Sequence, residues 1–253
     1  MIVVVPCYNE AERLPTDVFS SFLDKVPQVG FVFVNDGSRD RTPELLAELA
    51  ASHPSRIAAI DLERNRGKGE AVRRGLLLAM DHAPAIVGFW DADLSTPLEA
   101  IPQLAQVMIE HSEIEMVLGA RVGLLGHDIR RRVPRHYAGR IFATAASLVL
   151  GIPVYDTQCG AKLMRNTERL REVLREPFGS RWIFDVEMIA RFRQAGGKAR
   201  SIYEFPLDRW HDIGHSKVRP GDYLRAIFEL SAIHRRYRVT PGSSTRGDGR
   251  DPQ

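Results

Sequence analysis

The chain has 253 residues, of which 44% are hydrophobic and 26% charged, so it can bury the core of one large domain or two small ones. A formal net charge of +3 gives no overall indication of nucleic-acid binding, and two cysteines are too few for a disulfide scaffold, which favours a reducing, cytoplasmic setting. No basic signal-peptide region precedes the first apolar segment, and no apolar stretch reaches the roughly 18 residues expected of a spanning helix.

The first half of the chain alternates short apolar segments with longer amphipathic ones. Five segments are predicted to be strands: Ile2–Val5, Phe31–Asn35, Ile57–Asp61, Ile86–Trp90 and Met116–Gly119. Four segments between them are predicted to be helices: Ala11–Lys25, Thr42–Ser52, Gly67–His82 and Pro97–His111. The strands are apolar throughout, as parallel strands covered on both faces are. The alternation therefore predicts an α/β fold with right-handed crossovers.

After Arg121 the pattern changes. A Gly- and Arg-rich loop precedes 141–155, a stretch without any charge. Further predicted elements are the helices Thr167–Arg175 and Phe184–Gln194, the strand Ala199–Phe205, and the amphipathic helix Asp222–Tyr237. The apolar side of this last helix is expected to carry Tyr223, Ile227, Phe228, Leu230 and Ile233. The tail, 240–253, is rich in Gly, Ser, Arg and Asp and is predicted to be disordered.

Polar motifs follow each of the first four predicted strands. They are Pro6-Cys7-Tyr8-Asn9-Glu10, Asn35-Asp36-Gly37-Ser38, Asn65-Arg66-Gly67-Lys68-Gly69 and Asp91-Ala92-Asp93. Because ligands bind at the carboxyl ends of the strands in open α/β sheets, we expect these four motifs to form one site. Each motif alone is also typical of an ordinary strand-to-helix turn. Their joint order and spacing favour a nucleotide site.

The side chains of these motifs fit a nucleotide that carries phosphates. Tyr8 offers a ring face for a base, and Asp36 can accept a hydrogen bond from a pyrimidine imide. Lys68 adds a cation between glycines that permit close backbone approach. Asp91 and Asp93 carry the hard oxygen ligands that suit Mg²⁺ or Mn²⁺ bridging two phosphates. One acid can face the metal while the other meets a ribose.

With these motifs, the chain resembles the family 2 glycosyltransferases of the GT-A fold, and among them the polyprenyl-phosphate sugar synthases such as the dolichyl-phosphate β-glucosyltransferases. The resemblance covers roughly residues 2–239 as one domain, with a nucleotide-sugar half, 1–121, and an acceptor half, 122–239. Later motifs also match: Asp156-Thr157-Gln158-Cys159-Gly160-Ala161-Lys162, Arg181–Glu187, Asp208-Arg209 and Ser216-Lys217-Val218. The first of these points to the glucosyl branch. Ser95 departs from the glutamine that mannosyl relatives often carry.

The resemblance implies roles for particular residues. Those expected to bind the nucleotide sugar are Pro6, Tyr8, Glu10, Asp36, Lys68, Asp91, Arg121, Arg209 and Lys217. Asp93 is implied as the main ligand of Mg²⁺ or Mn²⁺, with Asp91 beside it serving mainly the nucleotide. The implied reaction moves a hexose, with inversion, from a nucleoside diphosphate to a polyprenyl phosphate. UDP-glucose is the expected donor, and GDP-mannose remains an alternative.

A phosphate acceptor changes what the site must supply. Because a phosphate monoester has a second pKa near about 6, it is largely dianionic at neutral pH and needs little proton abstraction. Bringing this dianion to a diphosphate requires cations. A predicted clamp for the acceptor phosphate consists of Arg130, Arg131, Arg135 and Arg140. The alternative is a solvated basic loop.

Three carboxylates in the second half are candidates for catalytic work. The resemblance puts Asp185 and Glu187 at the family's acid-pair position near the acceptor, and Asp156 is a rival. We expect Asp185 or Asp156 to orient sugar hydroxyls or the acceptor. Helix capping and ion pairing are structural alternatives for all three.

Other functions and a membrane contact also stay open. A soluble family 2 enzyme could use a hydroxyl acceptor, and a non-enzymatic nucleotide-sugar-binding subunit is less favoured because the acidic pair and the lysines are intact. The chain is expected to be cytoplasmic, with peripheral membrane contact through 141–155 as one alternative and core packing as the other. Core packing is favoured for Asp222–Tyr237. The oligomeric state is left open.

Overall fold

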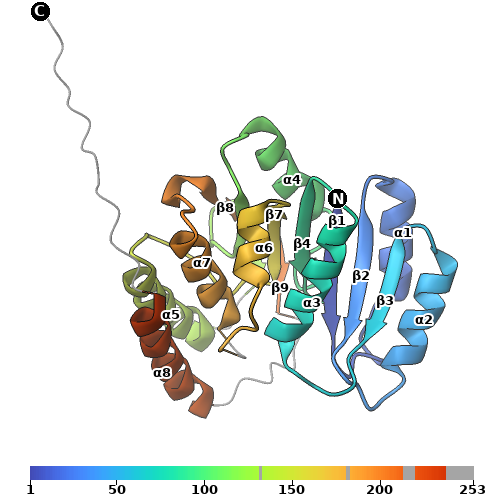
Figure 1. Cartoon of the computed structure of the whole chain (residues 1–253), viewed down its shortest axis with the longest axis horizontal. Helices are drawn as coiled ribbons and strands as arrows, with labels where there is room; N and C mark the ends of the chain where they lie inside the picture. Colours follow the sequence, from blue (N-terminus) through green and yellow to red (C-terminus); the bar gives the residue numbers. More distant parts are fainter. Residues whose placement is uncertain (131–132, 181–182, 213–219, 238–253) are drawn as a thin grey trace, which may run out of the picture.

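The computed structural model of the chain describes residues 1–130, 133–180, 183–212 and 220–237, with the backbone alone for 133–138 and 220–224. A seven-stranded sheet runs through the molecule in the order β3-β2-β1-β4-β7-β5-β8 (Figure 1). Its strands are β1 (Ile2–Cys7), β2 (Gly30–Asn35), β3 (Ile57–Asp61), β4 (Ile86–Trp90), β5 (Met116–Ala120), β7 (Ala161–Arg165) and β8 (Ile202–Pro206). All pairs are parallel except those of β7, which is antiparallel to β4 and β5. The predicted α/β architecture is confirmed, with a sheet that is mixed and mainly parallel.

Some strands were not predicted. β7 carries Lys162 and Arg165 within five residues, so its sequence lacks the uniformly apolar pattern of the other strands. A small second sheet pairs β6 (Asp128–Arg130) with β9 (Arg209–His211), and three residues are too few for a detectable pattern. The predicted strand at Ala199 is wrong in its first residues, because Ala199–Ser201 form a 3₁₀ turn before β8.

Eight α-helices lie within the described residues. They are α1 (Thr16–Lys25), α2 (Thr42–Ser52), α3 (Lys68–Asp81), α4 (Ala100–Glu110), α5 (Val133–Leu150), α6 (Glu168–Leu174), α7 (Phe184–Gln194) and α8 (Pro220–Tyr237). The predicted start of the first helix at Ala11 is wrong. Pro15 falls inside that range, and a proline removes a backbone donor and crowds the preceding turn, so α1 begins directly after it.

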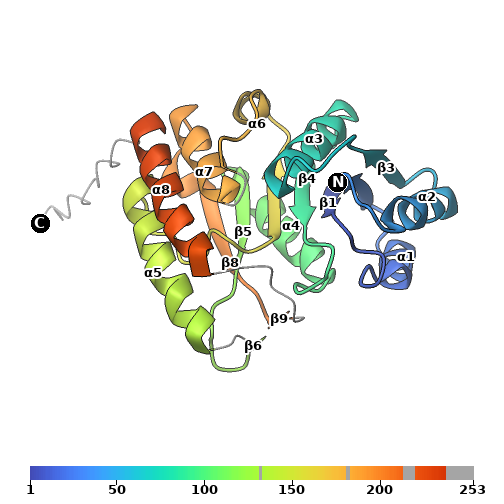
Figure 2. The same cartoon turned by 90° about the horizontal axis from the view of Figure 1, so that it is seen from below.

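Helices cover both faces of the sheet and form a core on each. Along β1, Val4 belongs to one core and Val3 and Val5 to the other, as the alternation of side chains on a strand requires. The first core also receives residues of α3, α5, α6, α7 and α8, and the second receives residues of α1, α2 and α4. Figure 2 shows α5, α7 and α8 grouped beside β5 and β8, away from α1 and α2.

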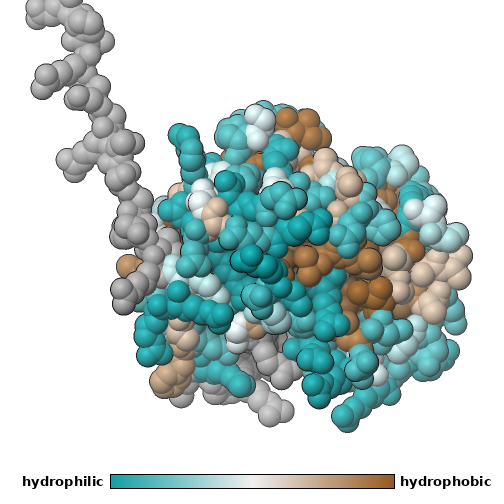
Figure 3. Space-filling model, in the orientation of Figure 1, coloured by the Kyte–Doolittle hydropathy of each residue, from teal (hydrophilic) through white to brown (hydrophobic). Residues whose placement is uncertain are grey.

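The apolar residues of α8 are divided between core and surface. The predicted single apolar side is wrong for Ile227 and Phe228, which are 58% and 74% exposed. The buried positions recur at helical spacing, and they are Ala226, Leu230, Ile233 and Tyr237. Core packing of this helix is thereby confirmed. Figure 3 shows a small hydrophobic area over α8 at the lower left, beside larger hydrophobic areas at the top and on the right of the same face.

The uncharged stretch 141–155 forms the last part of α5 and the loop beyond it. It too is divided, since Ala143, Ala146 and Leu150 are buried whereas Ile141 and Leu148 are 74% and 76% exposed. Both alternatives considered for this stretch therefore keep support: one side packs in the core and the other presents apolar groups to the surface. The predicted disordered tail, 240–253, lies outside the described residues.

Candidate active site

A pocket with a volume of about 510 Å³ opens at the carboxyl ends of β1, β2 and β4, beside the start of α3. Seven residues predicted from the strand-end motifs line it together: Pro6, Tyr8, Glu10, Asp36, Lys68, Asp91 and Asp93. Their neighbours Cys7, Asn65, Gly67 and Ala92 complete this side of the lining. The expectation that the four motifs meet at one sheet edge is confirmed.

Hydrogen bonds connect the loop after β1 to the loop after β2. The Asn9 amide donates to Ser38 Oγ at 3.0 Å, and the Arg39 amide donates back to Asn9 Oδ1 at 2.9 Å. The Glu10 amide donates to Thr42 Oγ1 at 2.8 Å. These bonds fix the first loop, and with it Tyr8 and Glu10, against the beginning of α2.

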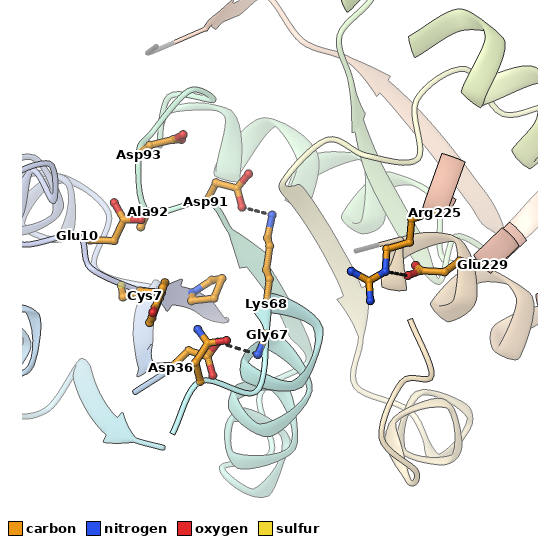
Figure 4. Close-up of a pocket in the computed structure, with 13 residues that line it drawn as sticks. Cys7, Glu10, Asp36, Gly67, Lys68, Asp91, Ala92, Asp93, Arg225 and Glu229 are labelled. Carbon is orange, nitrogen blue, oxygen red and sulfur yellow. Dashed lines mark hydrogen bonds and ion pairs between the residues drawn. The ribbon is translucent and has the colours of Figure 1, made fainter. Parts of the chain in front are cut away.

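Asp36 connects the second loop to the third. Its two carboxylate oxygens accept hydrogen bonds from the amides of Arg66 and Gly67, at 2.7 and 2.8 Å. Gly67 has a φ of +94°, a conformation that favours glycine, and α3 begins at the next residue. Asp36 thus positions the turn that delivers Lys68 (Figure 4). Its predicted contact with a base stays a prediction.

Lys68 and Asp91 form an ion pair at the centre of the pocket (Figure 4). Burial disfavours the charged form of Lys68, but the carboxylates of Asp91, Asp185 and Asp93 outweigh burial and raise the lysine pKa. Lys68 is therefore a cation at neutral pH. It offers this charge at the point where three carboxylates would otherwise repel an anionic ligand.

Asp93 occupies the turn beyond β4. Its Oδ1 accepts a hydrogen bond from the Ser95 amide at 2.9 Å, and the intervening Leu94 has a φ of +51°. Figure 4 shows Asp93 above Ala92 and Asp91, in the turn at the top of the view. Among the described residues, no group of three or more His, Cys, Asp or Glu side chains could hold a metal ion.

Gly160 connects the later Asp-Thr-Gln-Cys-Gly motif to Asp91. The Gly160 carbonyl accepts a hydrogen bond from the Asp91 amide at 2.9 Å. A Cβ at Gly160 would lie 1.9 Å from Asp91 Oδ2, so only glycine leaves room for this carboxylate. The sequence showed both motifs but not that one supports the other.

Asp185 lies in a buried ion pair outside the pocket lining. Lys162, which is fully buried, places its Nζ 2.5 Å from Asp185 Oδ1 and also donates to the Cys159 carbonyl. The ammonium lies 5.1 Å from the ring centroid of Phe89. The charge of Asp185 reaches the pocket, since it contributes to the raised pKa of Lys68. Its catalytic role stays a prediction beside this ion-pairing one.

Asp156 is held by Arg121 in a two-point ion pair. Arg121 Nε and Nη2 donate to Asp156 Oδ2 and Oδ1 at 2.6 and 2.8 Å, and the Arg121 amide adds a third bond. Although burial opposes the charge, Asp156 raises the pKa of Arg121. Both residues line a second pocket, of about 40 Å³, together with Arg140 and Tyr155.

Glu187 belongs to a polar cluster between α7 and α8. It accepts hydrogen bonds from Arg191 and Tyr237, both at 2.7 Å, and from the amides of Gly179 and Ser180. Burial opposes its charge, but these donors outweigh burial and lower the pKa of Glu187. Glu187 does not line the pocket, so a structural ion-pair role has direct support here.

The predicted arginine clamp is only partly described. Arg130 is 74% exposed at its side chain and pairs with Asp128 at 2.8 Å. Arg140 lies over the ring of Tyr155, 3.9 Å from its centroid. Arg131 and Lys217 lie outside the described residues, and the side chain of Arg135 is not described. Arg209 is exposed on β9 and does not line the 510 Å³ pocket.

Two pocket residues were missed in the sequence. Arg225 and Glu229 of α8 line the pocket together with the strand-end residues. Their i, i+4 spacing was a usable signal, because it places both side chains on one side of a helix. The apolar residues of this helix form the more conspicuous pattern in its sequence.

Comparisons with known proteins agree with this geometry. The family model "Glycosyl transferase family 2" matches residues 2–170. The dolichyl-phosphate beta-glucosyltransferase of Dictyostelium discoideum is 34% identical over 234 residues, covering 86% of this chain and 68% of that protein. The enzyme of that name from Saccharomyces cerevisiae is 30% identical over 257 residues, covering 93% of this chain and 74% of that protein.

A solved structure supports the fold. Glucosyl-3-phosphoglycerate synthase from Mycobacterium tuberculosis, in complex with Mn²⁺ and UDP-glucose, has a TM-score of 0.64 at 19% identity. The match covers 94% of this chain and 79% of that one. The chain therefore belongs to glycosyl transferase family 2 and is a glycosyltransferase with the GT-A fold.

Proposed function

We propose that the protein transfers glucose from UDP-glucose to a polyprenyl phosphate of the dolichyl type, with inversion at the sugar carbon. The observation that carries this proposal is the pocket in which seven strand-end residues meet, with Lys68 paired to Asp91 and Asp93 close by. Relatives named dolichyl-phosphate beta-glucosyltransferase, which match most of the chain, support the acceptor and the sugar.

The donor would lie along the edge formed by the first four motifs. Pro6, Tyr8, Glu10 and Asp36 would hold the nucleoside, since they line the side of the pocket formed by β1 and β2. The ammonium of Lys68 would lie nearest the diphosphate. Its raised pKa keeps it protonated there, so it can stabilise the negative charge that grows on the departing nucleoside diphosphate.

The residues present fit a divalent cation held partly by its substrate. Asp93, with Asp91, would supply one or two carboxylates, and Mg²⁺ characteristically combines this number with substrate phosphates. When bound, the cation would neutralise charge on the diphosphate.

The acceptor would approach from the side of α5 and α8. Its phosphate is itself the nucleophile and is already largely dianionic, so the chain need only place cations around it. Asp185 or Asp156 would orient the sugar or the acceptor through the ion pairs that hold them. Arg140 and the neighbouring predicted arginines would bind the acceptor phosphate.

Because a polyprenyl chain is apolar, the protein needs an exposed apolar surface to contact it or the membrane that holds it. No helix within the described ranges combines the length and apolarity that crossing a bilayer requires. The packed helices α5 and α8 expose Ile141, Leu148, Ile227 and Phe228. We propose that this surface makes peripheral contact with the cytoplasmic face of a membrane.

A donor and acceptor screen tests the proposal. The purified chain is incubated with UDP-glucose or GDP-mannose, a short-chain polyprenyl phosphate, and Mg²⁺ or Mn²⁺, and lipid-linked sugar is detected by mass spectrometry. We expect glucosylated lipid from UDP-glucose, lost on addition of a chelator. Asp93→Asn should lower turnover at least about a hundredfold, and the exposed Asp24→Asn serves as the matched control. Transfer only to hydroxyl acceptors would refute the proposal.

A further inference from the structure

Helix α8 brings a cation to the pocket from the side opposite the strand-end motifs. Arg225 and Glu229 line the same pocket as Lys68 and Asp91. The side chain of Arg225 is 72% exposed, and its Nε lies 3.6 Å from Glu229 Oε1. Figure 4 shows the guanidinium facing the opening that separates α8 from the Lys68–Asp91 pair. Its exposed position leaves it accessible to a ligand.

The ion-pair partner of this cation, Glu229, is anchored to a neighbouring segment. Glu229 Oε2 accepts a hydrogen bond from Ser180 Oγ at 2.5 Å, and the same Oγ accepts one from the Ile183 amide at 2.8 Å. Ile183 directly precedes α7, the helix that carries Asp185. The polar edge of α8 is thereby bonded to the start of α7.

Folding does not account for Arg225. An exposed arginine with an ion pair at 3.6 Å contributes little to stability, because solvent screens the charges and the long side chain must be ordered. The charges of the pocket do provide a reason. Its described lining contains five carboxylates, Glu10, Asp36, Asp91, Asp93 and Glu229, against the cations Lys68 and Arg225. Since Lys68 is paired with Asp91, Arg225 is the other cation that the described lining offers to a second anionic ligand.

The next turn of the helix carries an exposed aromatic ring. Phe228, three residues after Arg225, is 74% exposed, whereas Leu230 and Ile233 of the same helix are buried. Residues three apart are neighbours on a helix surface. A guanidinium beside an exposed phenyl ring suits a ligand that joins a phosphate to an apolar chain, because guanidinium matches phosphate in two-point hydrogen bonding.

We infer that Arg225 binds the phosphate of the polyprenyl phosphate acceptor and that Phe228 contacts the adjoining part of its chain. This inference rests on the proposed function and deepens it. It assigns to α8 an acceptor contact in addition to the arginines of 130–140. The donor, by contrast, is held on the strand-end side of the pocket.

Steady-state kinetics of the full chain test the inference. Arg225→Gln is compared with wild type at varied short-chain polyprenyl phosphate and at varied UDP-glucose. We expect the KM for the acceptor to rise about ten- to hundredfold, as for the loss of a hydrogen bond to a charged group, with the KM for the donor unchanged. Arg225→Lys should lose less, because it keeps the charge. Arg235→Gln, an exposed arginine of α8 outside the pocket lining, is the matched control and should behave as wild type.

A second variant tests the contact between Phe228 and the polyprenyl chain of the acceptor. Phe228→Ala should raise the KM for a long-chain polyprenyl phosphate more than for a short-chain one. Circular dichroism and thermal melting establish that each variant is folded, and calorimetric titration with the short-chain polyprenyl phosphate reports binding without turnover.

Two results separate the failure of this inference from that of the proposed function. If wild type transfers sugar to the lipid and Arg225→Gln keeps its acceptor KM, or instead raises the donor KM, the inference is overturned and the proposed function stands. If wild type neither binds nor glucosylates polyprenyl phosphate, the proposed function fails and the inference fails with it.

Discussion

Replacing Lys162 by methionine would leave the carboxylate of Asp185 as an unpaired charge inside the protein. Lys162 is fully buried, Asp185 is 4% exposed, and their charged atoms lie 2.5 Å apart. Removing one partner of such a pair costs about 3–5 kcal/mol, because the other charge stays desolvated. Methionine fills most of the same volume, so lost packing adds little. In a chain of this size, the loss lowers the melting temperature by roughly 6–20 °C.

Urea denaturation followed by circular dichroism measures the free energies of unfolding. The set comprises Lys162→Met, Asp185→Asn and the double variant, with Arg171→Met as a control that removes an exposed ion pair at 3.1 Å from Asp81. We expect the double variant to lose less free energy of unfolding than the two single variants lose together. Each single variant leaves a buried polar group without its partner, and the double variant removes both partners of the ion pair. The control should lose less than about 1 kcal/mol.

Either of two results would show that Lys162 does not stabilise the buried charge of Asp185. One is a loss below about 1 kcal/mol for Lys162→Met, which would mean that Asp185 finds another partner or solvent. The other is simple additivity of the two single losses, which would mean that the ammonium and the carboxylate are not coupled in the folded protein.

Two further predictions concern Gly160 and Glu187. Gly160→Ala should lower kcat/KM more than about tenfold in a folded protein, because the added Cβ would displace the Asp91 carboxylate. Gly123→Ala is the control and should leave kcat/KM unchanged, since a Cβ at Gly123 would meet open space. Equal activity of the two variants would contradict the predicted clash with Asp91. Glu187 has a lowered pKa, so its contribution to stability is present above the ordinary glutamate pKa of about 4.3 and is lost as the pH falls through its folded value. Glu187→Gln should therefore have a lower free energy of unfolding than wild type at pH 7, measured by urea denaturation, and this difference should become smaller under acid conditions. A difference that does not change with pH would contradict this role of Glu187.

The strand-end half of the site could be predicted from the sequence because local patterns determine it. An apolar strand followed by a polar turn is visible within ten residues, and parallel strands bring such turns to one edge. Local sequence alone therefore predicts that one site contains Tyr8, Asp36, Lys68 and Asp91, which do line one pocket.

The rest of the site depends on contacts between distant segments. Nothing near Asp185 in the sequence indicates that Lys162 pairs with it, and nothing near Asp91 indicates that Gly160 lies against its carboxylate. Both contacts depend on β7, which was not predicted as a strand because its two cations interrupt the apolar pattern. Arg225 reaches the pocket through the packing of α8 against α7, which a pattern of apolar residues does not define.

The antiparallel strand β7 has a consequence for how the enzyme is made. β4 and β5 do not pair with each other in the sheet, because β7 lies between them. A nascent chain that ends before residue 161 would present both strands with unpaired edges, which are sites of aggregation. It would also lack the Gly160 carbonyl to which the Asp91 amide is bonded. The predicted nucleotide-sugar half, 1–121, is therefore interleaved in space with the residues that follow it, and its part of the sheet cannot be completed during synthesis before β7 has emerged.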